Sequence, residues 1–231
     1  MSAIFTAIIV TAAPPGLAAE GSGIMAKVDG REVILRSVEL FLSRDNVKQV
    51  LLVITPEAEE EIKRKYGGSL GFLGVKVVIG GKKWNEQIVA AAARVDAEST
   101  HVLIHDAARP VTAVSDIDAI IEAADKNPAV MLATPLKTGL IELDEGGGPV
   151  ATHTPSSYMQ ILSPQALNRS RLTALVAGKE IHPSEWTIVR GSPLNVRVTS
   201  GADASLAGAM LKLLPKPKIK APSNPFEEAQ W

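Results

Sequence analysis

One short run of residues, His105-Asp106-Ala107-Ala108-Arg109-Pro110, places a carboxylate and a guanidinium beside two very small side chains. Asp106 could take one or two positions on Mg²⁺, an ion that prefers carboxylate oxygens together with phosphate oxygens of a ligand. Arg109 could hold an anion through its planar fork of donors. The alternative needs no ligand: Asp106 pairs with Arg109 and caps a turn that Pro110 ends. Residue types and spacing give the two interpretations equal weight.

A second candidate is the loop Thr11-Ala12-Ala13-Pro14-Pro15-Gly16, which follows an apolar strand candidate at Phe5 to Val10. Loops in this position of a doubly wound sheet bring backbone N–H groups up to phosphates. The alanines and the glycine allow close approach, whereas the prolines have no N–H to donate. The loop is therefore either a modest phosphate site or an ordinary connection between a strand and a helix.

The elements that must position these residues alternate along the chain. Strand candidates are Phe5 to Val10, Gln49 to Ile54, Val75 to Ile79, His101 to Ile104 and Val130 to Leu132. Helix candidates lie between them at Val33 to Leu42, Pro56 to Tyr66, Asn85 to Val95 and Ser115 to Ala124. This alternation predicts an α/β fold, a Rossmann-like and mainly parallel sheet flanked by helices.

The second half of the chain has a different pattern. The acidic, glycine-rich segment from Gly139 to Ser157 predicts a hairpin arm that projects from the sheet. We then expect a helix at Gln165 to Val176, a strand pair at Trp186 to Arg190 and Asn195 to Val198, and a last helix at Ala202 to Leu213. Residues 1–213 would form one domain, with the arm at about 139–157, and residues 214–231 a Pro-rich tail.

Composition excludes several classes of protein. The 231 residues carry a net charge of −1, and no run of Lys and Arg alternates with aromatic residues as nucleic-acid binding would require. No segment reaches the roughly 20 apolar residues that span a membrane. Met1 to Gly21 lacks the basic start of a signal peptide, so a buried first strand is the better interpretation. The absence of cysteine fits a cytoplasmic location and offers no thiolate for catalysis.

The run His105 to Pro110 resembles the signature of the 2-C-methyl-D-erythritol 4-phosphate cytidylyltransferases, a nucleotidyltransferase family. Other family landmarks follow in the same order and cover about Phe5 to Leu213, namely Thr11-Ala12-Ala13 with Gly16, Gly80-Gly81, Ser163-Pro164-Gln165 and Asn195-Val196-Arg197-Val198-Thr199. The resemblance implies transfer of CMP from CTP to 2-C-methyl-D-erythritol 4-phosphate in isoprenoid biosynthesis, with Mg²⁺ as cofactor and a homodimer formed through the arm.

The resemblance also implies a role for each matching residue. Asp106 would bind Mg²⁺, Arg109 and Ser163 the acceptor, and Arg197 would steady the α-phosphate as the catalytic residue. Nucleotide-binding positions would be Thr11, Ala12, Ala13, Gly16, Gly80, Gly81, Gln87, Asp106 and Ala107. The alternatives are a surface ion pair for Asp106 and Arg109, a solvated strand cation for Arg197 and, as the favoured interpretation, a helix N-cap for Ser163.

Several positions differ from the family pattern. The first loop lacks the family's Arg and Lys, Trp84 and Gln87 stand where the family has Arg and Ser, Pro155 replaces an Arg of the arm, and Leu194 replaces an Asp. Replacement cations could come from Lys27, Lys82, Lys83 or Lys137. Three further functions therefore stay open: a nucleotidyltransferase with another nucleotide or acceptor, a catalytically impaired relative that binds a nucleotide or protein partner, and a dimerisation or scaffold module.

Overall fold

The computed structural model describes residues 3–17 and 23–215. The Pro-rich tail expected at 214–231 lies outside this range except for its first two residues, and Ala18 of the first loop lies outside it as well. The division into one domain and a tail stays a prediction.

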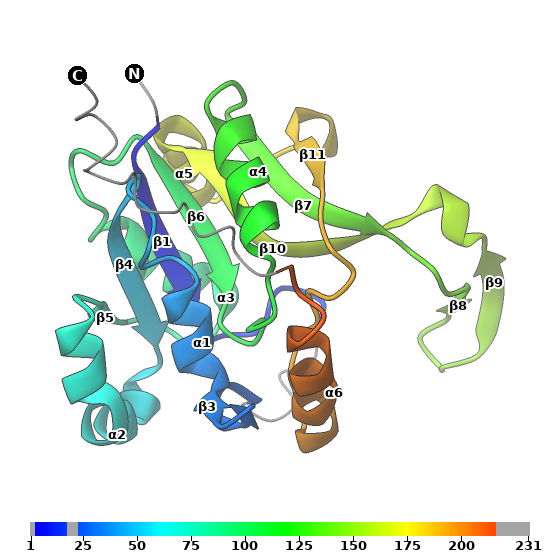
Figure 1. Cartoon of the computed structure of the whole chain (residues 1–231). Helices are drawn as coiled ribbons and strands as arrows, with labels where there is room; N and C mark the ends of the chain where they lie inside the picture. The colour runs from blue at the N-terminus through cyan, green and yellow to red at the C-terminus, as the bar shows by residue number, and fades with distance from the viewer. Residues whose placement is uncertain (1–2, 18–22, 216–231) are drawn as a thin grey trace, which may run out of the picture.

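The centre of the fold is a seven-stranded sheet in the order β11-β7-β10-β6-β1-β4-β5 (Figure 1). Its strands are β1 (Phe5–Val10), β4 (Val47–Ile54), β5 (Lys76–Ile79), β6 (His101–Asp106), β7 (Ala129–Pro135), β10 (Met159–Asn168) and β11 (Thr187–Arg190). All neighbours run parallel except β10, which is antiparallel to both β6 and β7. The predicted Rossmann-like, mainly parallel sheet is confirmed.

Helices cover both faces of the sheet (Figure 1). They are α1 (Val33–Glu39), α2 (Glu59–Phe72), α3 (Trp84–Ala92), α4 (Val114–Ala124), α5 (Arg169–Val176) and α6 (Gly201–Leu211). Alternate residues of β1 enter different cores, with Phe5, Ala7 and Ile9 facing the side of α1, α2 and α4, and Ile8 and Val10 facing the side of α3 and α5. A strand with two buried faces must be apolar throughout, which explains the sequence of β1.

Helix α2 continues beyond its predicted end. Pro56–Ala58 forms a 3₁₀ turn, and the helix then runs through Gly67, Gly68 and Gly71 to Phe72. Ile62, Tyr66 and Leu70 recur every four residues and are all buried. This apolar stripe keeps the chain helical despite the glycines. No helix in residues 3–17 and 23–215 has both the length and the hydropathy needed to cross a membrane.

Two predictions after the arm were wrong. Gln165 to Asn168 belong to β10, and α5 begins only at Arg169, with the Asn168 side chain accepting a hydrogen bond from the Arg171 N–H. Asn195 to Val198 form a loop in which Asn195 and Val198 are buried. The segment pairs with no strand of the described residues, and the Val198 N–H donates to the Ala108 carbonyl at 2.7 Å. The predicted partner segment is a strand, β11, but it pairs in parallel with β7.

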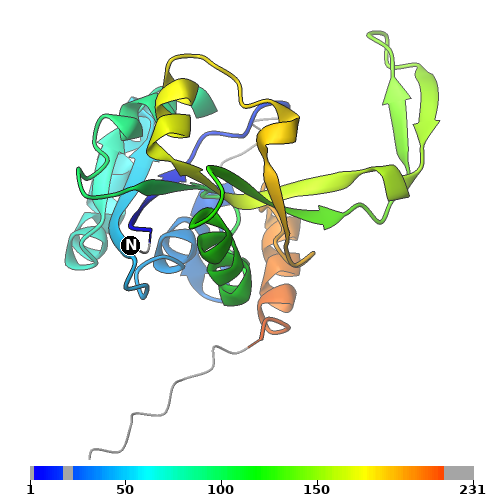
Figure 2. The same cartoon turned by 90° about the horizontal axis from the view of Figure 1, so that it is seen from above.

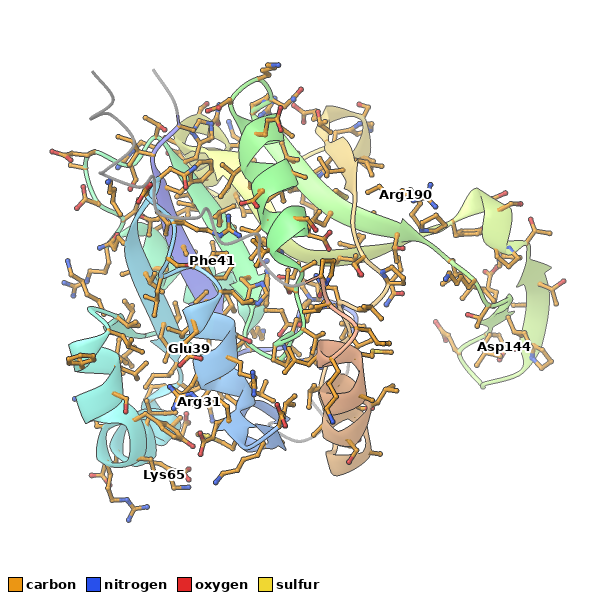
Figure 3. The ribbon with its side chains drawn as sticks, in the orientation of Figure 1. Arg31, Glu39, Phe41, Lys65, Asp144 and Arg190 are labelled. Carbon is orange, nitrogen blue, oxygen red and sulfur yellow. The ribbon has the colours of Figure 1, made fainter. Side chains whose placement is uncertain are left out.

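The projecting arm is confirmed as a hairpin of β8 (Leu140–Leu143) and β9 (Pro149–His153), followed by a 3₁₀ turn at Pro155–Ser157. It extends from β7 and β10 away from the rest of the molecule, as Figure 2 shows. Asp144 at the far end of the arm (Figure 3) accepts hydrogen bonds from the N–H groups of Gly146 and Gly148. These bonds explain the acidic and glycine-rich sequence of the turn.

Small elements complete the fold. They are the hairpin of β2 (Lys27–Val28) and β3 (Arg31–Glu32) and the 3₁₀ turns at Gly23–Met25 and Pro183–Glu185. The first 3₁₀ turn lies so close to the loop before α6 that a Cβ at Gly23 would stand 2.1 Å from the Val198 carbonyl oxygen. This loop carries Arg197, so the contact helps to place that side chain.

Candidate active site

Asp106 is the last residue of β6 and lies at the carboxyl end of the parallel strands, next to a cavity of about 830 Å³. Pro14 and Pro15 of the first loop, Trp84 of α3 and Ser163 of β10 also line this cavity. Ligands of doubly wound sheets bind at this edge. The geometry therefore marks this edge as the place for chemistry.

Each oxygen of the Asp106 carboxylate accepts one hydrogen bond from its own chain. Oδ1 accepts a hydrogen bond from the Ala108 N–H at 3.0 Å, Oδ2 accepts one from Arg197 Nε at 2.9 Å, and Arg109 Nε lies 3.6 Å from Oδ2. Because Asp106 is only 1% exposed, the surface ion pair considered above is excluded. The turn cap and the ion pair with Arg109 do exist, but both are buried.

Arg109 is almost completely buried beside this carboxylate. Its Nη1 donates to the Asn195 carbonyl at 2.6 Å, and the Asn195 amide donates to the Ser163 carbonyl at 2.6 Å. Burial lowers the pKa of the guanidinium, although Asp106 opposes the effect. Arg109 Nε and Asn195 Oδ1 are the two buried side-chain atoms of the described residues that lack a hydrogen-bond partner. One donor and one acceptor thus remain free in the site.

Ser163 and His105 link β10 to β6. The Asp106 N–H donates to Ser163 Oγ at 2.8 Å, and Ser163 Oγ lies 2.9 Å from His105 Nδ1. His105 Nε2 faces the Arg109 carbonyl at 3.2 Å, so Nε2 carries the proton and the serine hydroxyl donates to Nδ1. Ser163 is therefore part of a strand and no helix N-cap, which corrects the favoured interpretation. Burial holds the pKa of His105 down to about 3, helped by the charge of Arg109.

Arg197 reaches Asp106 from the loop before α6. Its side chain is 16% exposed, and its predicted alternative as a solvated strand cation is wrong on both counts. The loop is fixed on its far side by α6, whose N-cap Ser200 accepts from the Asp203 N–H. From the sequence we assigned no role to His105 or Asn195, although both lie in the quoted motifs. Neither residue type indicates by itself that the side chain will hold a neighbouring residue in place.

A second group of predicted residues surrounds the side chain of Gln87 on α3. Gln87 Oε1 accepts hydrogen bonds from the N–H groups of Thr11 at 2.9 Å and Ala12 at 3.1 Å, and its Nε2 donates to the Gly81 carbonyl at 3.0 Å. A Cβ on Gly80 would stand 2.8 Å from Val53 Cγ1 and 3.0 Å from the Gln87 Cα, so any other residue there would displace these neighbours. The first loop, the Gly80-Gly81 loop and α3 are thus fastened together.

The other predicted nucleotide-binding residues lie around these two groups. Ala13 and Gly16 flank the two prolines that line the cavity, and Gly16 has a φ of 78°. Ala107 is completely buried, and its N–H bonds to the Val10 carbonyl at 2.9 Å. Its methyl group packs in the core under the site, so it leaves room without facing the cavity.

The cavity has little positive charge for a site that would hold a triphosphate. Among the described residues that line it, Arg109 is the one cation, against Asp106 and Glu180. Lys82 pairs with Glu57 at 2.7 Å, and Lys27 lies 3.8 Å from Glu32. The lining also contains the apolar side chains of Trp84, Ile88, Ile181 and Trp186. Neither lysine lines the cavity.

The family model described as 2-C-methyl-D-erythritol 4-phosphate cytidylyltransferase matches residues 6–213. The chain belongs to this family. The family member of Frankia casuarinae is 30% identical over 194 residues, which cover 79% of this chain and 71% of the relative. That of Rhodopirellula baltica is 28% identical over 231 residues, with 88% and 93% covered.

A solved structure supports the fold of this family member. The 4-diphosphocytidyl-2C-methyl-D-erythritol synthase of Anaerococcus prevotii superposes with a TM-score of 0.73 at 23% identity, covering 91% of this chain and 96% of the other. Family membership extends over nearly all the described residues, from β1 to the end of α6. It therefore includes both clusters of site residues.

Proposed function

We propose that this protein transfers the cytidylyl group of CTP to the phosphate of 2-C-methyl-D-erythritol 4-phosphate, as the names of its relatives describe. One observation carries the proposal beyond family membership: Asp106, Arg109 and Ser163 line one edge of the cavity, and Arg197, from a third segment, binds Asp106 there. Converging polar groups at such an edge support a reaction on a charged substrate.

The chemistry follows from the charges at this edge. An oxygen of the acceptor phosphate would attack the α-phosphorus of CTP, a new P–O bond would form, and the bond to the β-phosphate would break to release pyrophosphate. Negative charge builds on the non-bridging oxygens of the α-phosphate during this step. In the proposal Arg197 and Arg109 offset that charge, and Asp106 holds both guanidinium groups in place.

Mg²⁺ is the proposed cofactor, and Asp106 its proposed ligand. No group of three or more His, Cys, Asp or Glu side chains that could hold a metal exists within residues 3–17 and 23–215. One carboxylate next to a cavity fits Mg²⁺ nevertheless, since this ion commonly takes one or two carboxylates and completes its shell with phosphate oxygens and water. When bound, it would neutralise charge on the triphosphate.

A homodimer through the arm is part of the same proposal. Ile141, Leu143 and Val150 of the arm are more than half exposed, at 63%, 58% and 59%. A two-stranded hairpin is marginally stable on its own, and apolar side chains on it need a covering surface. A second copy of the chain, packed on the arm, would supply that surface. We also propose that the protein is located in the cytoplasm, because a sequence without cysteine suits a reducing compartment.

A catalytically impaired relative is the second candidate function. It is favoured by the scarcity of cations at the cavity, because loss of one electrostatic contact to a transition state commonly costs about 10²–10³ in rate. Such a protein would bind a nucleotide and release it unchanged.

One experiment separates the candidates. Pyrophosphate release is measured from the purified chain with Mg²⁺, each nucleoside triphosphate and 2-C-methyl-D-erythritol 4-phosphate, and nucleotide binding is measured by calorimetry on the same sample. Release with CTP and this acceptor is the expected result. Binding without release identifies the impaired relative, and release with another nucleotide or acceptor but not with CTP and 2-C-methyl-D-erythritol 4-phosphate would replace the proposed substrates.

A further inference from the structure

Three backbone groups around Gln87 form a row of hydrogen-bonding positions. The Thr11 and Ala12 N–H groups are donors, and the Gly81 carbonyl is an acceptor. They come from the two loops that are expected to hold the nucleotide. The Gln87 carboxamide meets all three at once, with its oxygen on the two donors and its nitrogen on the acceptor.

The orientation of this carboxamide is fixed by its surroundings. If the amide were flipped, its NH₂ group would face two N–H donors and its oxygen would face a carbonyl, so all three contacts would be lost. Thr11 Oγ1 donates to the Val53 carbonyl at 2.9 Å, which leaves its lone pair for Gln87 Nε2 at 3.3 Å. Gln87 is completely buried, and every polar atom of its side chain is satisfied.

The same row of backbone groups complements the pairing edge of cytosine. That edge presents two acceptors, O2 and N3, followed by a donor, the N4 amino group, and proteins read bases through such edges. The edge of uracil differs at two of the three positions, since N3 carries a proton and O4 is an acceptor. Uracil would therefore oppose a donor with a donor and a carbonyl with a carbonyl.

We propose that the Gln87 carboxamide imitates a cytosine edge and occupies the backbone groups that would otherwise select that base. Gln87 is then a specificity-determining residue: while it fills these positions, CTP gains little from its base over other triphosphates. This inference rests on the proposed nucleotide-binding function. It concerns only the base, and the phosphate-binding residues at Asp106 are separate from it.

Removing the side chain should expose the base-reading groups. Gln87→Ala leaves two buried N–H donors and a carbonyl without partners, which is unfavourable in the free protein and is relieved when cytosine binds. We expect a dissociation constant for CTP that is about tenfold lower than in the wild type, with no gain for UTP. Wild-type protein should bind CTP and UTP with dissociation constants within about threefold.

The matched control is Gln87→Glu. Its carboxylate keeps an acceptor on the Thr11 and Ala12 N–H groups but has no donor for the Gly81 carbonyl. The two donors of the row stay occupied, so no gain for CTP is expected. Calorimetry with CTP and UTP on the three proteins is the primary measurement. The rise in melting temperature on adding CTP should be largest for Gln87→Ala.

Each result leads to a definite conclusion. An equal or weaker affinity of Gln87→Ala for CTP, or an equal gain for UTP, would overturn the inference while leaving the proposed function in place. If Gln87→Ala does not fold, binding to the wild type tests the inference. A wild-type preference for CTP over UTP of more than about tenfold would contradict the occupation of the base-reading backbone groups by Gln87. Absence of binding of every nucleotide to both folded proteins overturns the proposed function and this inference with it.

Discussion

The Asp106 carboxylate holds together three parts of the site with two oxygens. One oxygen caps the turn through the Ala108 N–H, and the other binds Arg197 and lies near Arg109. A buried carboxylate between two guanidinium groups is stabilised by their positive charge, and its negative charge stabilises both guanidinium groups. Loss of this single negative charge leaves two cations facing each other.

Asp106→Asn should lower the rate of pyrophosphate release from CTP about 10²–10³-fold, because Arg197 and Arg109 lose the group that positions them. The amide oxygen of Asn can still accept from the Ala108 N–H, so the turn should persist. Steady-state kinetics at saturating CTP measures the change. The control is Asp118→Asn, which alters an exposed carboxylate of α4 that pairs with Arg44; this variant should keep full activity. Unchanged turnover in Asp106→Asn would remove Asp106 from the mechanism.

His105 makes stability depend on pH. The unfolded chain binds a proton at this imidazole near its ordinary pKa of 6.5, whereas the folded protein does so only near pH 3. The pKa is depressed in a base, so stability is fully present above about pH 6.5 and falls as the pH drops through the window towards 3, by up to about 1.4 kcal/mol per pH unit. Urea unfolding at pH 7.5, 6 and 5 measures this slope.

His105→Gln isolates the contribution of this one imidazole. Gln keeps a donor for the Arg109 carbonyl but does not titrate, so the slope between pH 7.5 and 5 should decrease. The slope should not vanish, because burial also lowers the pKa of His101. Identical slopes in the two proteins would show that His105 is not held neutral by the fold.

At the level of elements, two glycines that the sequence does not distinguish should respond in opposite ways to substitution by alanine. Gly68 lies in the middle of α2 with no atom within 4 Å of an added Cβ, whereas a Cβ at Gly23 would collide with the backbone of Val198 and Thr199. Gly68→Ala should raise the free energy of unfolding by about 0.5–1 kcal/mol. Gly23→Ala should lower it by about 1–3 kcal/mol. Chemical denaturation of both variants tests the pair, and a stabilised Gly23→Ala would contradict the close approach.

The sequence predicted most elements of the sheet because β1, β4 and β6 are buried on both faces and therefore carry continuous apolar runs. It misplaced the start of α5, because Gln165 to Asn168 mix polar and apolar residues and are held as a strand by both neighbours, β6 and β7. Polar and apolar residues alternate from Asn195 to Val198 as they would in a strand, but the polar side chains of Asn195 and Arg197 bond to other residues of the site. In both places tertiary contacts outweighed the local pattern.

The sequence motifs were enough to predict which residues belong to the candidate site. Asp106, Arg109, Ser163 and Arg197 do meet, as their order along the family pattern implied. The hydrogen bonds that join them were not predictable. Whether Gln87 contacts a ligand or fills the place of one depends on the positions of two loops, and a single sequence holds no signal for that choice.

At the scale of the whole molecule, the exposed arm predicts self-association. The double variant Ile141→Glu with Val150→Glu places two charges on apolar side chains that are 63% and 59% exposed. We expect a dimeric wild type and a monomeric variant in sedimentation velocity, because burial of an unpaired charge is costly. Phe72→Glu, at a 92% exposed position on α2, is the control and should leave the mass unchanged. A wild type that sediments as a monomer at micromolar concentration would refute the dimer.

The position of β10 has a consequence for synthesis on the ribosome. β10 lies between β6 and β7 but follows both in the chain, after the arm. Until residues 159–168 leave the exit tunnel, β6 and β7 each present an unpaired edge to other nascent chains. The arm is made during this interval, so its length adds to the time for which these two edges stay unpaired. We therefore expect slower translation through the arm codons to lower the yield of native protein.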